Sequence, residues 1–363
     1  MKPLVLDKIT SVTANCRLSR EVKIGTTFPC KEGDVIAVRI LTGKSTYNQV
    51  ELETGRFSQL KPGDIVAGAL GHRKALRGYA GHMPTSLKPG DILNILNLGG
   101  VLGICDSVNP DVGPPFECEV LGQILHFPFL GERRNLPANI AQDAPPLDEV
   151  LTCDVPVVAV VGTSMSAGKT FACTSLIQSM THRGMNVAAA KATGVSLKRD
   201  VLCMEDAGAR ATSIFTDLGV VTTTALNAPA LTRTMLNHLS EKKPDVIVLE
   251  LGDGLLGAYG VDAILADEGI RASFSVVMLA ANDPVAAWGG HRRLKEEYGI
   301  ETTLITGPAT DNAAGTDLIN ALLGVPGCNA RTAPEHLAET VIDGLSEATT
   351  TPAGESDTLK SVS

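Results

Sequence analysis

One segment near the middle of the chain restricts the fold more than any other. An apolar run, Val157–Val161, leads into the Gly-bounded loop Gly162–Gly168, and Lys169 and Thr170 then open a helix-length stretch. In such a unit, glycines let backbone N–H groups turn toward phosphate oxygens, and the helix directs its positive end at them. The lysine can bridge the β and γ phosphates, and the Thr hydroxyl can ligate Mg²⁺. The order of these parts predicts a phosphate loop that binds a nucleoside triphosphate.

The loop differs from the common spacing, because five residues rather than four separate Gly162 from Gly168. The alternative interpretation is a strand–turn–helix unit with an incidental lysine. The ordered succession of strand, Gly-Lys-Thr and helix favours the phosphate loop. The residues that we expect to contact the nucleotide are Gly162, Thr163, Ser164, Met165, Ser166, Ala167, Gly168, Lys169, Thr170 and Phe171.

Residues 155–346 alternate apolar strands with helix-length segments. The expected strands are Pro156–Val161, Asn186–Lys191, Val220–Thr224, Asp245–Leu251, Ser273–Leu279 and Thr302–Ile305, and the expected helices include Lys169–Arg183, Ala230–Glu241 and Val285–Tyr298. Strands that are apolar throughout indicate a sheet covered on both faces. The predicted fold class is therefore α/β, a P-loop NTPase domain whose mostly parallel sheet lies between helices. Ligands of such sheets bind at the carboxyl ends of the strands.

The preceding residues, 1–126, have the pattern of a smaller β-rich domain. A Lys-x-Gly-Asp phrase followed by Val or Ile occurs at Lys31, Lys61 and Lys88. Each phrase predicts a tight turn that opens a strand, and repeated turn–strand units are typical of a small barrel or sandwich. Residues 127–154 are rich in Pro and polar side chains, which predicts a linker. Small polar residues dominate 347–363, which predicts a disordered tail.

Composition excludes several kinds of partner. The formal net charge of −9 argues against nonspecific DNA or RNA binding, and 4% aromatic residues offer few rings for stacking on single strands. The eight cysteines include no Cys-x-x-Cys pair, so we expect reduced thiols rather than a zinc site. The amino terminus lacks the apolar core of a signal peptide, and no apolar run is long enough to cross a membrane. We expect a cytoplasmic protein without a membrane partner, and a homodimer is compatible with the sequence.

Three motifs together resemble the dethiobiotin synthetase family. Gly162–Thr170 is similar to the family's long phosphate loop Gly-Thr-Asp-x-x-x-Gly-Lys-Thr, Lys191–Gly194 to its Lys…Thr-Gly turn, and Glu250–Gly254 to its Glu-Gly-x-Gly-Gly segment. The resemblance covers about residues 155–310 and implies binding of ATP and Mg²⁺, with Glu250 near the metal and the Lys191 turn beside the substrate. Ser164 stands where the family has Asp, the Lys191 turn is two residues shorter, and an extra domain precedes the loop. These departures indicate a relative of the family rather than a dethiobiotin synthetase.

The DUF1611-type family of P-loop proteins is also similar. Its members carry a Gly-Thr-Asp-Cys-x-x-Gly-Lys loop, an Ala-Thr-Gly turn and an Asp-x-x-Gly-Ala segment. Ala192–Gly194 resembles the turn, and Asp206–Ala209 resembles the third motif. Some members are linked to acyl-amino-acid metabolism, and their amino-terminal domain is of a different kind.

Charged and small residues at the strand ends complete the candidate site. Lys169, Lys191 and Glu250 are the expected catalytic residues, and Thr170 and Glu250 the expected Mg²⁺ ligands. The residues expected to bind an anionic substrate are Lys191, Thr193, Gly194, Arg199 and Asp253. For Arg199, together with Lys198, a solvated loop is an equally good interpretation.

Two further segments have more than one interpretation. Asp200 is best interpreted as a favourable first-turn charge on a helix, whereas Asp206 is either such a charge or a partner of the metal that replaces the missing loop Asp. The basic, Gly-bounded loop Gly71–Gly78 is best interpreted as an exposed hairpin. Its alternative is a contact to an anion, or a lid over the phosphate loop.

These features predict an ATP- and Mg²⁺-dependent enzyme that activates a small carboxylate or carbamate, in the manner of a ligase or synthetase. Lys169 would neutralise the transferring group, and Lys191 would orient the acceptor. Two alternatives remain: a nucleotide-driven conformational switch or assembly factor with a protein partner, and a binding protein regulated by nucleotide. The absence of an Asn-Lys-x-Asp guanine signature favours ATP over GTP.

Overall fold

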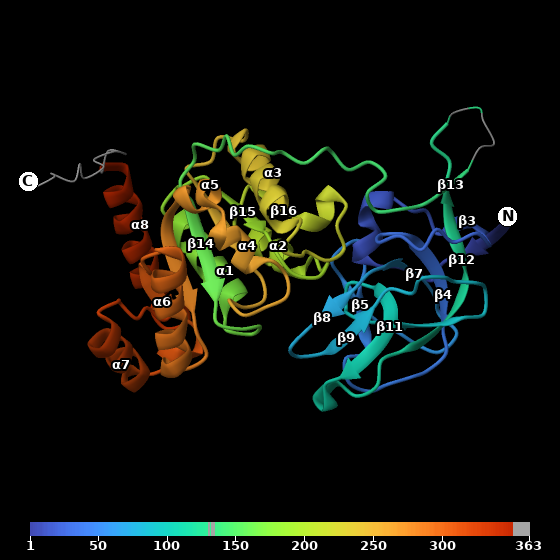
Figure 1. Cartoon of the computed structure of the whole chain (residues 1–363), viewed down its shortest axis with the longest axis horizontal. Helices are drawn as coiled ribbons and strands as arrows, with labels where there is room; N and C mark the ends of the chain where they lie inside the picture. The colour runs from blue at the N-terminus through green and yellow to red at the C-terminus, as the bar shows by residue number, and fades with distance from the viewer. Residues whose placement is uncertain (130, 132–134, 351–363) are drawn as a thin grey trace, which may run out of the picture.

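The chain folds into two domains that lie side by side along the long axis of the molecule (Figure 1). The computed structural model describes residues 1–129, 131 and 135–350. Two clusters of buried side chains fill the amino-terminal β domain and a third fills the α/β domain. The predicted fold class is confirmed, because an α/β domain with a parallel sheet follows a smaller β-rich domain.

The β domain is built on one large, mostly antiparallel sheet with the strand order β1-β3-β12-β4-β7-β11-β9-β8. The remaining strands attach to its sides, apart from the separate hairpin β5–β6. The elements are β1 (Lys2–Val5), β2 (Lys8–Ile9), η1 (Ser11–Cys16), β3 (Glu21–Gly25), β4 (Val35–Ile40), β5 (Gln49–Glu51), β6 (Phe57–Gln59), β7 (Ile65–Leu70), β8 (Arg73–Lys74), β9 (Tyr79–His82), β10 (Ile92–Ile95), β11 (Val101–Val108), η2 (Pro110–Val112), β12 (Glu117–His126) and β13 (Leu136–Pro137).

Three turns of the same chemistry precede β4, β7 and β10, as the repeated phrase predicts. They are Lys31–Asp34, Lys61–Asp64 and Lys88–Asp91. In each, the Asp carboxylate accepts a hydrogen bond of 2.8 to 2.9 Å from the backbone N–H of the Lys. The Gly of each turn has a φ of 82° to 94°, a left-handed conformation that residues with a Cβ seldom adopt.

The α/β domain has six parallel strands among the described residues, in the order β16-β15-β17-β14-β18-β19. The strands are β14 (Val157–Gly162), β15 (Val187–Lys191), β16 (Ala211–Ile214), β17 (Val246–Glu250), β18 (Phe274–Ala280) and β19 (Leu304–Thr306). The helices are α1 (Lys169–His182), α2 (Arg199–Asp206), η3 (Phe215–Leu218), α3 (Ala228–Ser240), α4 (Val261–Ala266), α5 (Glu268–Ala272), α6 (Pro284–Tyr298), η4 (Pro308–Thr310), α7 (Ala313–Leu323) and α8 (Pro334–Thr350).

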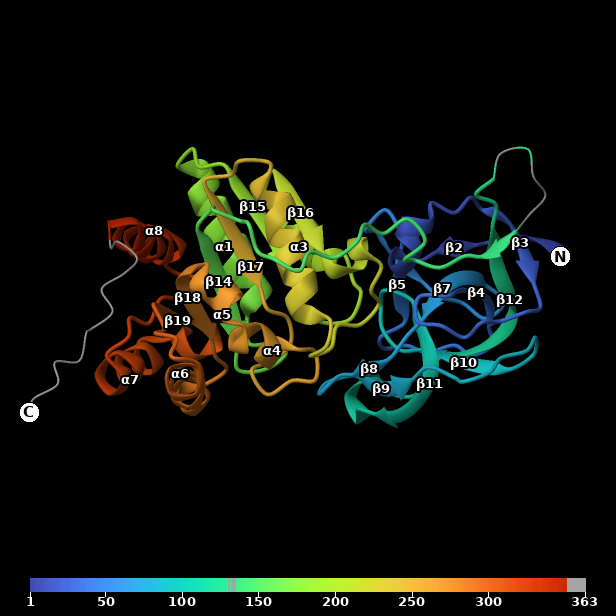
Figure 2. The ribbon, with the colours of Figure 1, turned by 45° about the horizontal axis from the view of Figure 1, so that its top comes forward.

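Helices cover the sheet on two sides. On one face, α1 packs against both α2 and α8, and α3, α4 and α5 pack together on the other. In Figure 2, α6 and α7 lie together beside the β18–β19 end of the sheet. The strand β14, which leads into the phosphate loop, is buried at every position between β17 and β18. The loop therefore emerges from the middle of the sheet's carboxyl edge.

The expected strand Val220–Thr224 is wrong. The third strand of the sheet is instead β16, where Ala188–Lys191 of β15 pair with Ala211–Ile214. Val221 is fully buried, but it packs with the β-domain core, and the neighbouring Thr222 bonds to His72 and Glu32 of that domain. The apolar run that suggests a strand is thus part of the contact between the domains.

The segment that joins the domains is bound along its course. Ala138 and Ile140 are buried in the β-domain core. Farther on, the backbone N–H of Asp148 donates 2.7 Å to the Thr234 hydroxyl of α3, and the backbone N–H of Thr152 donates 2.7 Å to the side-chain oxygen of Asn237. The Asn237 amide in turn donates 2.8 Å to the Asp148 carboxylate. Within the predicted tail, residues 347–350 belong to α8, and residues 351–363 lie outside the described residues. None of the helices in the described part of the chain has the length and hydrophobicity to cross a membrane.

Candidate functional site

The phosphate loop folds back over the end of β14. Ser166 and Gly168 have φ values of 63° and 95°, so the chain reverses sharply before α1 begins. The Lys169 side chain returns across the loop, where its Nζ donates 2.9 Å to the Ser164 carbonyl and a second hydrogen bond to the Asp253 carbonyl. A Cβ on Gly162 would lie 2.8 Å from that Nζ, so only glycine lets the lysine take this path.

Burial makes the Lys169 ammonium group ready for an anion. Its side chain is only 5% exposed, and both of its bonded partners are neutral carbonyl groups. Loss of solvation lowers the pKa of Lys169, an effect that the nearby Glu250 opposes. A phosphate bound against the loop would supply a negative charge that offsets the solvation this cation loses by burial.

Glu250 and Thr170 meet beside the loop. Glu250 ends β17, which runs next to β14, and its Oε1 accepts a 3.0 Å hydrogen bond from the Thr170 hydroxyl. Burial first, and then the charge of Asp200, raise the pKa of Glu250, although Lys191 and Lys169 oppose the shift. Its other oxygen, Oε2, is buried and receives no hydrogen bond from the described residues.

Hard oxygen donors of this kind suit Mg²⁺. A carboxylate oxygen without a hydrogen-bond donor and an adjacent hydroxyl are the ligands that this ion takes from proteins, with phosphates and water completing its shell. No cluster of three or more His, Cys, Asp or Glu side chains that could hold a metal occurs among the described residues. A magnesium ion bound with a nucleotide does not need such a cluster, so Thr170 and Glu250 fit the predicted role.

Lys191 is held by an ion pair that sequence reasoning missed. It ends β15 opposite Glu250 of β17, and its Nζ donates to Asp200 Oδ2 in the first turn of α2. Both side chains are about nine-tenths buried. Burial disfavours the charge on Lys191, but the attraction of Asp200 and Glu250 outweighs it and raises the pKa. Likewise, Lys191 overcomes the effect of burial on Asp200 and lowers the pKa of that carboxyl.

Asp200 is thus more than a first-turn helix charge. One signal in the sequence could have identified it, because a lysine that ends a buried strand requires a nearby countercharge. Arg199 Nε lies 3.7 Å from Asp200 Oδ1, so this residue also belongs to the group rather than to a loop outside the site. Glu205 and Asp206, in contrast, are exposed on the far end of α2.

The remaining predicted substrate residues shape the site mainly through their backbone. The Thr193 hydroxyl donates 2.9 Å to the Gly252 carbonyl, and a Cβ on Gly252 would lie 2.1 Å from the Thr193 carbonyl oxygen. Gly194 and Asp253 have φ values of 133° and 72°. Burial raises the pKa of Asp253, although the charge of Lys169 opposes the shift.

Ser164, which stands where the resembled family has Asp, has its own partner. Asn282, just after β18, donates a hydrogen bond of 2.6 Å to the Ser164 hydroxyl. Asp206 lies away from this position, so it does not replace the missing loop acid. The acidic side chains of the α/β domain that do face the site are Asp200, Glu250 and Asp253.

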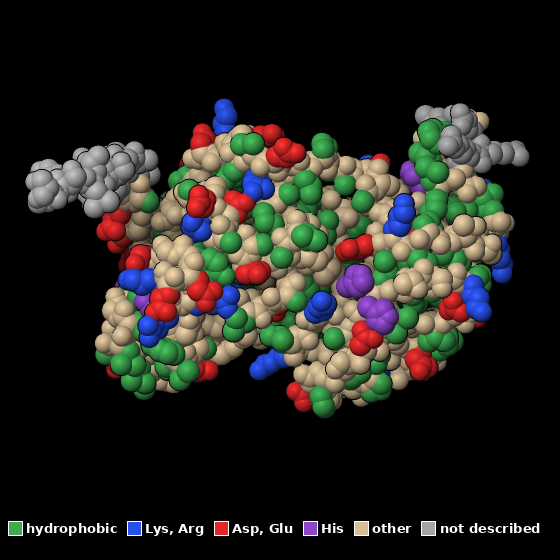
Figure 3. Space-filling model, in the orientation of Figure 1, with side chains coloured by type: hydrophobic (Ala, Val, Ile, Leu, Met, Phe, Trp, Pro, Cys, Tyr) green, Lys and Arg blue, Asp and Glu red, His purple; other side chains and the backbone are tan. Residues whose placement is uncertain are grey.

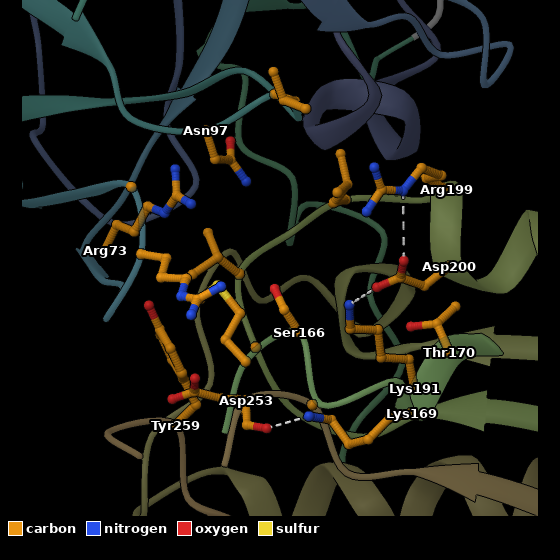
Figure 4. Close-up of a pocket in the computed structure, with 18 of the residues that line it drawn as sticks. Arg73, Asn97, Ser166, Lys169, Thr170, Lys191, Arg199, Asp200, Asp253 and Tyr259 are labelled. Carbon is orange, nitrogen blue, oxygen red and sulfur yellow. Dashed lines mark hydrogen bonds and ion pairs between the residues drawn. The ribbon is translucent and has the colours of Figure 1, made fainter. Parts of the chain in front are cut away.

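The charged side chains of the site, together with Thr170, line one cavity of about 590 Å³, which lies between the two domains. Figure 4 shows Lys169, Thr170 and Lys191 on one side and Arg73 and Asn97 of the β domain on the other. Of the predicted phosphate-loop residues, six line the cavity: Met165, Ser166, Gly168, Lys169, Thr170 and Phe171. The other four, Gly162, Thr163, Ser164 and Ala167, form the framework behind them. On the outside, Figure 3 shows the surface hollowed where the domains meet along its lower edge.

The basic loop Gly71–Gly78 is part of this cavity, so the exposed-hairpin interpretation does not hold for all of it. Arg73, Arg77 and Gly78 line the cavity, and Arg73 is buried. The loop is also bonded to the α/β domain, since the backbone N–H of Lys74 donates 2.9 Å to the Tyr259 hydroxyl.

A second, smaller hollow of about 80 Å³ continues from the phosphate loop. Ser166, Gly168 and Phe171 line both spaces. The half-exposed Phe171 ring lies on one side, with the Arg331 guanidinium 5.4 Å from its centroid, and Gly307–Pro308 follow β19 on another. A flat ring beside a phosphate loop is suited to stacking on a nucleobase.

No known protein family matches the sequence, and no curated protein matches it. Some solved structures are similar at a distance. The signal recognition particle receptor FtsY from Elizabethkingia anophelis is 15% identical, with a TM-score of 0.38 over 57% of this chain and 69% of that one.

Two other solved structures are similar to about the same degree. The signal recognition particle 54 kDa protein from Aeropyrum pernix, in complex with GDP, is 19% identical, with a TM-score of 0.37 over 58% of this chain and 51% of that one. A DUF1611 family protein from Anabaena variabilis is 15% identical, with a TM-score of 0.39 over 60% of this chain and 65% of that one. Likenesses of this degree do not bear on the activity of the chain.

Proposed function

We propose that this protein binds ATP with Mg²⁺ and uses it to activate a small carboxylate or carbamate, as a ligase or synthetase does. One observation carries the proposal. The phosphate loop, the Glu250–Thr170 pair and the buried Lys191 face the same cavity, and that cavity has room for more than the phosphates of a nucleotide. Its volume lies within the range of small-molecule sites, roughly 300–1,000 Å³.

The chain's own residues supply the binding and positioning. Lys169 and the loop N–H groups would bind the β and γ phosphates, so that Lys169 exchanges its carbonyl partners for phosphate oxygens. Phe171 would stack on the adenine. Mg²⁺ held by Thr170 and Glu250 would neutralise phosphate charge when bound.

The proposed reaction is a phosphoryl transfer. An oxygen of the acceptor carboxylate attacks the γ-phosphorus, the bond from that phosphorus to the β,γ-bridging oxygen breaks, and ADP leaves with the electron pair. The product is an acyl phosphate. Lys191 would hold the anionic acceptor near the anionic γ-phosphate, and Asp200 would keep the Lys191 side chain in place.

The test is a screen of small carboxylates and amines for acceptor-dependent ADP release, with the product mass measured. We expect one acceptor class to stimulate ADP release and to gain the mass of a phosphoryl group or of its ligation product. Lys191→Ala should bind ATP as the wild type does and lose roughly a hundredfold in transfer, the scale for removal of one preorganised charge. If no acceptor stimulates ADP release, and Lys191→Ala hydrolyses ATP at the wild-type rate, the synthetase proposal is wrong.

A conformational switch is the second candidate, because one loop contacts both the nucleotide site and the β domain. Between β17 and α4, the Asp253 carbonyl accepts a hydrogen bond from Lys169, and the Tyr259 hydroxyl accepts one from Lys74. A phosphate that took Lys169 from Asp253 would alter this loop. Hydrolysis stimulated by a protein partner, without any small acceptor, would favour this candidate.

A further inference from the structure

Arg73 is a buried cation without an acidic partner. Its side chain is 8% exposed and lines the cavity from the β-domain side. Its Nη1 donates 3.1 Å to the Tyr47 hydroxyl and also to the Leu96 carbonyl, and no carboxylate among the described residues forms an ion pair with it. A buried guanidinium is costly unless an anion compensates it, so Arg73 is poised to bind one.

The chain fixes Arg73 relative to the phosphate loop. On one side of it, the His72 carbonyl accepts a 2.6 Å hydrogen bond from the Thr222 hydroxyl. On the other side, the Lys74 N–H donates 2.9 Å to the Tyr259 hydroxyl. Gly78, with a φ of 120°, passes so near that a Cβ there would lie 2.8 Å from Arg73 Nη2. Both neighbours of Arg73 are therefore bonded to the α/β domain, and its side chain has little freedom.

A second arginine completes the arrangement. Arg77 lies in the same loop, is exposed, and also lines the cavity. Asp111 is the acidic residue that the β domain contributes to the lining, and neither arginine forms an ion pair with it. Two guanidinium groups, one buried and one exposed, present the planar pairs of donors that match a carboxylate.

We infer that Arg73 and Arg77 bind a carboxylate of the second substrate, remote from the group that receives the phosphoryl. The inference rests on the proposed function and narrows its substrate class to small dicarboxylates, or compounds with a carboxylate at each end. One end would lie against the β domain and the other would face Lys191 and the γ-phosphate, since Figure 4 shows Arg73 and Lys191 on opposite sides of the cavity. The β domain thus selects the substrate, and the α/β domain activates it.

The experiment measures binding of malonate, succinate, glutarate and inorganic phosphate by calorimetry. It uses the full-length protein saturated with Mg²⁺ and a non-hydrolysable ATP analogue. We expect at least one dicarboxylate to bind the wild type, and to bind Arg77→Ala about tenfold more weakly or worse, the scale for lost hydrogen bonds to a charged group. The analogue itself should bind both proteins within about twofold, since the arginines contact the second substrate.

Two further variants make the result interpretable. Arg39→Ala removes an equal charge from the same domain, at an exposed ion pair with Glu119 outside the cavity lining, and should bind the probes as the wild type does. Arg73→Lys keeps the positive charge but loses the planar pair of guanidinium donors, and it should weaken dicarboxylate binding as well. If the melting temperature of Arg73→Lys falls, the test rests on dicarboxylate binding by Arg77→Ala, because Arg77 is exposed.

Several outcomes would overturn the inference. The inference is wrong if Arg77→Ala binds dicarboxylates as tightly as the wild type does, if phosphate binds but no dicarboxylate does, or if no probe binds. It is also wrong if Arg77→Ala loses affinity for the ATP analogue, because the loop would then contact the nucleotide. The proposed function fails separately, if the wild type does not bind the analogue at all.

Discussion

Replacing Asp200 with Asn tests whether a buried ion pair keeps Lys191 charged and in place. The two side chains are 10% and 9% exposed, so water screens their attraction little. Removing one partner of a buried pair costs about 3–5 kcal/mol, because the remaining charge stays unsolvated. Glu250 also attracts Lys191 and remains in the variant, so we expect a loss in unfolding free energy near the lower end, about 3 kcal/mol.

The loss in unfolding free energy caused by Asp200→Asn should depend on pH in a definite direction. Burial opposes the charge on Lys191, but Asp200 and Glu250 raise its pKa, so its contribution is present below the unfolded pKa and disappears as pH rises through the folded one. The pKa of Asp200 is lowered against the effect of burial, so its contribution is lost only as pH falls through that lowered value. In Asp200→Asn, the pKa of Lys191 should fall. The stability gap from the wild type should therefore be wide at neutral pH and narrow toward alkaline pH, where a neutral lysine needs no partner.

Urea denaturation between pH 6 and 11 measures the difference in unfolding free energy between the wild type and the variant, and ATP-analogue calorimetry on the same samples measures the nucleotide affinity of each. Asp206→Asn is the matched control, because it removes an equal charge from the exposed end of the same helix and should change stability little. An Asp200→Asn variant as stable as the control, or a gap that does not change with pH, would refute the assignment of Asp200 as the residue that holds Lys191.

Three other predictions concern the nucleotide. Lys169→Ala should abolish ATP binding in calorimetry, because no other phosphate-loop side chain carries a positive charge, and unchanged affinity would remove the loop from the site. Glu250→Gln should keep ATP affinity but lose most turnover and need more Mg²⁺, and a normal Mg²⁺ titration would exclude Glu250 as a ligand. Phe171→Ala should weaken ATP roughly tenfold to a hundredfold by loss of stacking worth about 1–3 kcal/mol, and a matched titration with GTP would show which base the hollow prefers.

The parts of the fold that depend on local sequence were predictable. The phosphate loop requires glycines and a lysine at short spacing, and each buried strand shows as a continuous apolar run, so β14, β15, β17 and β18 lie where the pattern predicts them. The Lys-x-Gly-Asp turns are equally local, since the Asp, the Gly and the Lys N–H that form each turn lie within four residues.

The parts that depend on contacts between distant segments were not predictable in the same way. Val221 is apolar, which suggests a buried strand, but its side chain packs against the core of the other domain. Asp200 has the pattern of an ordinary helix-start charge, and only the folded chain brings it against Lys191. Arg73 likewise lies in a loop whose glycines and basic residues suit an exposed hairpin, and its burial arises from Tyr47, Leu96 and Gly78.

Two of these errors, at Val221 and Arg73, have a common cause, and it bears on function. Val221 and Arg73 both lie where the two domains meet, and Thr222 and His72 beside them bond to each other across that boundary. A chain whose domains moved freely would not need an apolar residue or a fixed arginine there. Because these residues hold the β domain against the carboxyl edge of the sheet, the cavity in front of the phosphate loop keeps a defined shape. A defined shape is what a site needs in order to discriminate among small acceptors, whereas hydrolysis of a nucleotide alone needs only the phosphate loop and its metal.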